Sequence, residues 1–196
     1  MEAPVPASSL IHSATLVSAG IFLLLRFNVL LVESGLQNLV ILIGSLTAAY
    51  GAVVSASQTD VKKLLAYSTM SHCGFLFALT GMGDPYITVI YLILHGIFKA
   101  MTFYCVGSFI RLYGTQDSRL MGGAAQFYWG DTFLLLLGAG NLCGLPFTVG
   151  ITYKSFFLKL LCSSSLSIFS LGFFFIAMLA SLVYFYRLVY YILFDI

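Results

Sequence analysis

Long apolar stretches alternate with short polar ones along the whole chain. The pattern predicts membrane-crossing helices over residues 10–27, 38–57, 61–82, 86–112, 131–161 and 166–186. A helix needs roughly 20 residues to cross a bilayer core of about 30 Å, and these stretches reach that length or come close to it. We therefore expect residues 1–196 to form a single all-α domain, a polytopic transmembrane helix bundle of about six spans.

The fifth stretch is predicted to be a broken helix. Residues 131–161 are too many for one straight span, and Gly144-Leu145-Pro146 and Gly150 interrupt them. Backbone groups released by such a break are tolerated at membrane depth only where protein or water satisfies them. We therefore expect the helix to be broken near residues 144–150, as helices in membrane transporters can be.

Composition excludes a soluble fold. The chain is 60% hydrophobic and 8% charged, whereas soluble domains carry roughly a quarter charged residues. The charges are scattered singly, with no basic run, so lipids and not nucleic acid are the expected surroundings. Basic residues gather at one set of predicted helix ends, which should face the matrix or cytoplasm together with the N-terminus. They are Lys62, Lys63, Arg111, Arg119 and Arg187.

Tyr91, His95 and Lys99 form the strongest candidate for chemistry. Their spacing of four residues places three proton-exchanging groups on one helix face, about 6 Å apart along the axis. Apolar residues occupy the other faces, so the polar stripe should look into the bundle or a hydrated cavity. The alternative is that Lys99 snorkels to the interface and His95 bonds a backbone carbonyl, but Lys99 lies deep within its apolar stretch.

Lys154 is the second candidate, because it lies just beyond the predicted break. Carbonyls and amides freed by the break can solvate its charged form. The alternative is that Lys154 and Lys159 only mark the end of the span. His12, near the start of the first stretch, is either a capping residue or part of a relay. His72, with Lys62 nearby, is a weaker candidate for an access path from the positive side.

Several motifs share their residues and order with one family of membrane proteins. They are Met1-Glu2-Ala3-Pro4-Val5-Pro6 with Ser9-Leu10-Ile11-His12, Ala19-Gly20-Ile21-Phe22, Gln58-Thr59-Asp60-Val61-Lys62-Lys63 with Ala66-Tyr67-Ser68-Thr69, His95-Gly96-Ile97-Phe98-Lys99-Ala100-Met101, and Gln116-Asp117 with Arg119 and Met121-Gly122-Gly123. In these motifs the chain resembles the antiporter-like membrane subunits of respiratory complex I, and among them the chain 5 group. Sodium-proton antiporters of the Mrp type share much of the pattern.

The resemblance implies a role for each candidate. His95 and Lys99 would belong to a central hydrophilic axis, Lys154 would be the distal lysine of the broken helix, and His12 would join the neighbouring relay. Two departures stand out. Tyr91 replaces a histidine of many relatives, and Ser155 replaces the acid that often follows the distal lysine.

The resemblance also implies a function in proton translocation, as a subunit of a proton-translocating NADH:ubiquinone reductase. NADH, FMN, iron-sulfur clusters and ubiquinone would be bound by other subunits of the membrane complex, and this chain would hold no cofactor. The four cysteines fit that expectation, since their spacing gives no ligand pair and they read as small buried residues: Cys73, Cys105, Cys143 and Cys162.

The resemblance covers only part of a complete subunit. It implies one piece of a split subunit, with a separate chain supplying the missing first half. The mitochondrial inner membrane is the expected location, and a bacterial plasma membrane is the alternative. The rival functions are a piece of a sodium-proton antiporter and a structural membrane subunit that does not pump.

Overall fold

A computed structural model describes residues 4–163 and 168–194, apart from the side chains at positions 6, 12–14, 161–163, 168 and 194. Helices dominate these residues, and no β-strand occurs among them, as the sequence predicts. The elements are α1 (Val5–Ser9), η1 (Leu10–Thr15), α2 (Leu16–Arg26), α3 (Asn28–Glu33), α4 (Gln37–Ser57), α5 (Val61–Gly81), α6 (Pro85–Tyr113), η2 (Ser118–Leu120), α7 (Ala124–Phe127), α8 (Trp129–Cys143), α9 (Val149–Ser163), α10 (Ile168–Val189) and η3 (Tyr190–Phe194).

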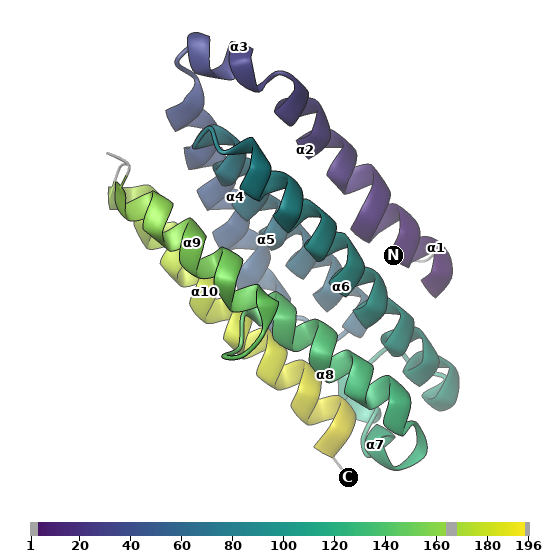
Figure 1. Ribbon diagram of the computed structural model, residues 1–196. Helices are drawn as coiled ribbons and strands as arrows, with labels where there is room; N and C mark the ends of the chain where they lie inside the picture. The colour runs from purple at the N-terminus through teal and green to yellow at the C-terminus, as the bar shows by residue number, and fades with distance from the viewer. Residues whose placement is uncertain (1–3, 164–167, 195–196) are drawn as a thin grey trace.

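The long helices lie side by side in one bundle (Figure 1). Within the described residues, three segments are long and apolar enough to cross a membrane: Gln37–Ser57, Pro85–Tyr113 and Phe169–Leu193. The other predicted spans correspond to α1–η1–α2, to α5 and to the pair α8–α9. That these also cross the membrane stays a prediction.

The break predicted in the fifth stretch lies between α8 and α9. Helix α8 ends at Cys143, and Gly144 follows it with φ of 75°, the left-handed conformation that glycine adopts at helix ends. Helix α9 begins at Val149 and continues roughly the line of α8, with the connecting loop bulging to one side in Figure 1. The two halves therefore meet inside the bundle, next to α10.

Small residues hold α4 and α5 in close contact. A Cβ atom at Gly44 would lie 2.8 Å from the Gly74 carbonyl oxygen, and one at Gly51 would lie 2.7 Å from the Ser71 backbone nitrogen. Glycine at such contacts lets helix backbones approach in a membrane, where no hydrophobic effect drives helices together. The contact fixes the rotation of α5, which is buried along most of its length.

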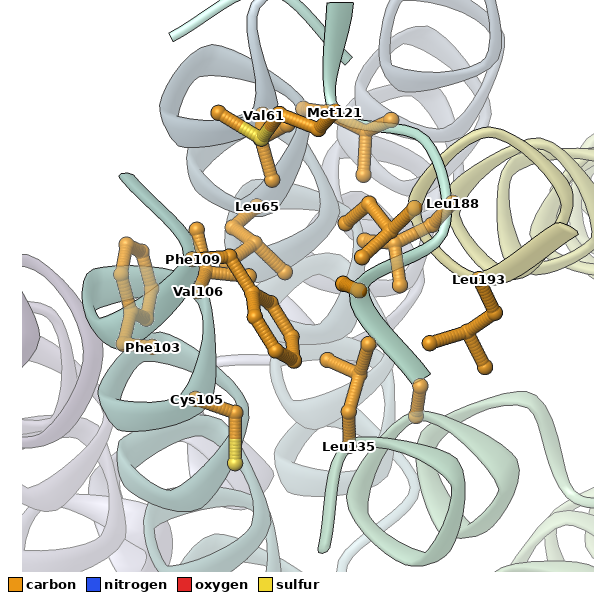
Figure 2. Close-up of a cluster of buried hydrophobic side chains, with 14 of the residues drawn as sticks. Val61, Leu65, Phe103, Cys105, Val106, Phe109, Met121, Leu135, Leu188 and Leu193 are labelled. Atoms are coloured by element: carbon orange, nitrogen blue, oxygen red, sulfur yellow. The ribbon is translucent and has the colours of Figure 1, made fainter. Parts of the chain in front are cut away.

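Apolar side chains join the ends of several helices into one cluster. Figure 2 shows members from α5, α6, α8, α10, η3 and the linker after η2: Val61, Leu65, Phe103, Cys105, Val106, Phe109, Met121, Leu135, Leu188 and Leu193. Cysteines lie in the packed interior, as the sequence predicts: Cys73, Cys105 and Cys143 are buried and form no disulfide. The side chain of Cys162 lies outside the described residues.

The predicted basic end of the bundle is held together by hydrogen bonds to backbone carbonyl oxygens. The Val61 amide donates to the Gln116 carbonyl oxygen over 3.1 Å, which joins the start of α5 to the linker after α6. The Arg187 guanidinium at the end of α10 donates to the Ala56 carbonyl oxygen at the end of α4. Helix termini that are distant in sequence thus lie at the same end of the bundle.

An ion pair at this end makes stability depend on pH. The Lys63 ammonium lies 2.7 Å from the Asp60 carboxylate. Its hydrogen bond holds the pKa of the Asp60 carboxyl below the ordinary value of 3.8. A carboxyl whose pKa is lowered by folding adds stability above its unfolded pKa, and this stability is lost as the pH falls through the folded pKa.

Asp60→Asn is therefore expected to lower the unfolding temperature slightly at pH 7. The difference should shrink as the pH falls below the ordinary value of 3.8 and vanish once the pH lies below the lowered pKa of the folded carboxyl, where Asp60 of the parent protein is also protonated. The effect is small because the Lys63 and Asp60 side chains are 55% and 29% exposed. Thermal unfolding in detergent at both pH values measures it. Glu33→Gln, at an exposed acid, is the control, and an equal loss at both pH values would contradict the prediction.

Candidate functional site

The predicted stripe on α6 lies in the interior of the bundle. Tyr91, His95 and Lys99 are 2%, 2% and 0% exposed. On the other side of the helix, Ile93 and Ile97 are both 56% exposed. Three polar groups one turn apart therefore point inward, while the apolar face of the same helix points outward.

Lys99 bonds to a neutral partner on the neighbouring helix. Its Nζ donates to the Ser68 hydroxyl oxygen of α5. Ser68 is itself fully buried and donates to the Leu65 carbonyl oxygen over 2.8 Å. A hydroxyl can accept a hydrogen bond from either an ammonium or an amine, so this contact is compatible with gain and loss of a proton at Lys99.

His72 of α5 lies at the centre of the group. Its Nδ1 is 2.7 Å from the Tyr91 hydroxyl, and its Nε2 is 3.4 Å from the hydroxyl of Tyr184 on α10. The ring centroids of His72 and His95 are 5.2 Å apart. In either neutral tautomer, an imidazole offers one donor and one acceptor, so His72 can connect partners on both sides.

His95 has an unsatisfied ring nitrogen. Its Nε2 is buried and has no hydrogen-bond partner among the described residues. Buried polar atoms without a partner are rare in proteins, and they often coincide with function. This nitrogen lies in the interior, on a ring that stands beside His72 and one turn from Lys99.

Lys154 binds a carbonyl that the helix break exposes. Its Nζ donates to the Cys143 carbonyl oxygen over 2.9 Å, and the Ser181 hydroxyl oxygen lies 3.5 Å away. Cys143 is the last residue of α8, where carbonyls have no partner in their own helix. The side chain of Lys154 is 8% exposed, so the break and the lysine form one buried site.

Asn141 and Tyr153 hold the two halves of the broken helix together. The Asn141 side-chain oxygen accepts from the Gly150 amide over 3.3 Å, and its backbone oxygen accepts from the Tyr153 hydroxyl over 3.0 Å. The Tyr153 ring stacks on Tyr91 with centroids 4.4 Å apart. The break is thus linked to the stripe on α6.

The remaining predicted residues lie far from the Lys99 and Lys154 sites, or their side chains are not among those that the structure describes. Lys62 is buried but lies ten residues from His72 on α5, about 15 Å along the axis. His12 belongs to η1, and its side chain lies outside the described residues. Between residues 4 and 194, so far as they are described, no group of three His, Cys, Asp or Glu residues is placed to hold a metal ion. The absence of a cofactor stays a prediction.

Sequence reasoning missed four polar residues of the site: Ser68, Asn141, Ser181 and Tyr184. Ser68 occurs within one of the motifs, but nothing in the motif indicates its contact with Lys99. Asn141 lies just before the predicted break. Ser181 and Tyr184 belong to an aromatic-rich helix whose spacing singles out neither.

The family described as "NADH:quinone oxidoreductase/Mrp antiporter, TM" matches residues 1–184. The chain belongs to this NADH:quinone oxidoreductase/Mrp antiporter family. Membership confirms the resemblance that the motifs indicate, and it identifies the helical bundle as that of a multi-pass membrane protein.

Curated members of the family include proteins named NADH-ubiquinone oxidoreductase chain 5. That of Paramecium tetraurelia is 50% identical over 157 residues, which cover 79% of this chain and 28% of the relative. That of Branchiostoma lanceolatum is 36% identical over 193 residues, which cover 97% of this chain and 32% of the relative. The chain thus spans about a third of the length of these family members.

Solved structures of membrane complexes share the fold. The Mrp complex from Dietzia sp. contains a chain with a TM-score of 0.82 and 32% identity, matched over 98% of this chain and 22% of that one. An archaeal respiratory complex, the membrane-bound sulfane sulfur reductase, gives a TM-score of 0.85 at 21% identity over 98% of this chain and 41% of that one. The second likeness supports the fold alone.

Proposed function

We propose that this chain carries protons across a membrane as part of the membrane arm of respiratory complex I. The observation that carries the proposal is the buried set of proton-exchanging groups that begins at Lys99 and His95 and continues through His72. It lies in a bundle whose curated relatives are named NADH-ubiquinone oxidoreductase chain 5.

Buried lysines suit this task because their surroundings are neutral. Lys99 and Lys154 donate to a hydroxyl and a carbonyl, so each site accommodates both the ammonium and the amine. Like charges repel strongly in a low-dielectric interior, so a proton arriving at one site favours release from the next. The imidazoles of His95 and His72 pass protons between sites, and the Tyr91 hydroxyl extends the hydrogen bonds. His12 and Lys62 belong to the access paths.

The energy for transport comes from redox chemistry elsewhere in the complex. NADH oxidation and ubiquinone reduction take place on other subunits, which bind FMN and the iron-sulfur clusters. The location that follows is the mitochondrial inner membrane, or the plasma membrane in a bacterium. A separate polypeptide supplies the first half of the subunit, and mass spectrometry of the purified complex would test this by identifying the neighbours of this chain.

A second candidate is a sodium-proton antiporter. It is favoured by the 32% identity with a chain of the Mrp complex. An antiporter would move protons in response to a sodium gradient and without NADH. Transport in sealed vesicles with either NADH or sodium as the driving force separates the two functions.

Lys154→Ala in the assembled complex is expected to reduce proton pumping by about a hundredfold, the lower end of the contribution of a proton-transfer group. NADH oxidation with a soluble electron acceptor should remain, because it requires no membrane transport. Pumping is measured by the quenching of a pH-sensitive dye in vesicles. Lys159→Ala, five residues further on the exposed side of α9, is the matched control. Normal pumping by the Lys154 variant would contradict the proposal, and loss of assembly alone would favour a structural subunit.

A further inference from the structure

We propose that one turn of α10, carrying Ser181 and Tyr184, positions both the His72 site and the Lys154 site and thereby couples them. The inference rests on the proposed function and deepens it, because it assigns a positioning role to a helix with no lysine or histidine of its own. Residues three apart on a helix share a face. The side chains of Ser181 and Tyr184 are 3% and 2% exposed, so this face is buried.

Tyr184 reaches toward the α6 stripe. Its hydroxyl lies 3.4 Å from His72 Nε2, on the opposite side of the imidazole from the Tyr91 hydroxyl. His72 is therefore held between two tyrosine hydroxyls from different helices. Fixing both ring nitrogens sets the orientation of an imidazole and the tautomer it adopts. Tyr184 is thus placed to determine whether the proton of neutral His72 is on Nε2 or on Nδ1.

Ser181 reaches toward the broken helix. Its hydroxyl oxygen lies 3.5 Å from Lys154 Nζ and donates to the Met178 carbonyl oxygen over 2.6 Å. Its backbone carbonyl accepts from the Cys143 thiol over 3.0 Å. Cys143 also supplies the carbonyl that Lys154 binds, so Ser181 holds the lysine and its acceptor together.

Cys143 connects the two halves of this arrangement. Its thiol donates to the Ser181 carbonyl oxygen, and the Tyr184 side chain lies beside it. A displacement of Lys154 or of its acceptor therefore changes the position of Tyr184, and Tyr184 in turn changes the position of His72. Coupling between sites travels through packed and hydrogen-bonded groups of this kind.

The α10 turn also stands between the groups around the two lysines. Starting from Lys99, the Ser68 hydroxyl and His72 lie one turn apart on α5. Tyr184 of α10 lies 3.4 Å from His72, and Ser181 of the same turn lies 3.5 Å from Lys154 on α9. Helix α10 packs along α4 and is held at its end by the Arg187 hydrogen bond, so the turn has a fixed place in the bundle.

Four variants in the assembled complex test the inference. Tyr184→Phe and Ser181→Ala each remove one hydroxyl, and each should lower the number of protons pumped per NADH oxidised by about three- to tenfold, the scale of one hydrogen bond. Ser181→Thr keeps the hydroxyl and should pump normally. Because the two residues act as one unit, the double variant should pump no less than the weaker single variant. Two residues with separate structural roles would instead give multiplied losses.

Matched controls come from the same helices. Tyr186→Phe changes a tyrosine of α10 that is 65% exposed, and Ser155→Ala changes an exposed serine of α9. Both should pump normally. If Tyr184→Phe does not assemble, Ser181→Ala decides the question by itself. Normal pumping by an assembled Tyr184→Phe variant, or by Ser181→Ala where that variant decides, overturns the inference.

Failure of the proposed function would look different. In that case Lys154→Ala would also pump normally, whatever the α10 variants do. If Lys154→Ala loses pumping while Tyr184→Phe and Ser181→Ala retain it, only the role of α10 is wrong.

Discussion

Lys99→Met is expected to abolish proton transport while leaving the bundle at least as stable as before. Lys99 is 0% exposed, and its Nζ donates a hydrogen bond to the Ser68 hydroxyl oxygen. Methionine has a similar volume and is easily accommodated, but it carries no proton. A buried ionisable group usually lowers stability, so its replacement by an apolar residue removes a cost. Activity and stability should therefore change in opposite directions.

The measurement combines proton pumping in vesicles with thermal unfolding in detergent. Pumping should fall by about a hundredfold or more, the range for general acid–base groups, and the unfolding temperature should stay the same or rise. Lys159→Met serves as control, because that side chain is exposed on α9. A lower unfolding temperature together with a partial loss of pumping would mean that Lys99 is a structural residue.

Gly150→Ala should disrupt the packing more than the same substitution at any other glycine of the described residues. A Cβ atom at this position would lie 1.7 Å from the Asn141 backbone oxygen, far inside van der Waals contact. Helix α9 would have to move away from α8, and Lys154 would lose the Cys143 carbonyl. We expect a loss of about 3 kcal/mol or more in stability, at the upper end for overpacking, and loss of pumping.

Gly172→Ala is the control for this effect. Nothing lies within 4 Å of a Cβ atom at Gly172, which is within α10. The same substitution there should raise stability by roughly 0.5–1 kcal/mol, because alanine favours the helix. The amount of assembled complex and its unfolding temperature distinguish the two variants. Equal behaviour would show that α8 and α9 are not in tight contact at Gly150.

The features that depend on one helix could be predicted from the sequence. Tyr91, His95 and Lys99 lie on one face of α6 because their spacing matches the helix period, and their neighbours are apolar. The break after α8 was also predictable, because Gly144 and Pro146 interrupt a stretch too long for one span. Both arguments are local and need no knowledge of how the helices pack.

Contacts between helices could not be predicted in this way. Ser68 meets Lys99 across 31 residues of sequence, and Tyr184 meets His72 across 112. Such contacts depend on the rotation of each helix about its own axis. For α5 that rotation follows from its close packing against α4, which the hydrophobic pattern does not record. His72 therefore received less weight from the sequence than its central position in the structure supports.

The glycine contacts between α4 and α5 limit how the protein can move during transport. Backbones that touch through Gly44, Gly51 and Gly74 leave no room for one helix to slide or turn against the other. Ser68 and His72 are carried on this rigid pair. Residues 144–148, by contrast, form a non-helical joint between two short helices. If helices move during transport, we expect the movement at α9, and we expect α4 and α5 to keep their relative position.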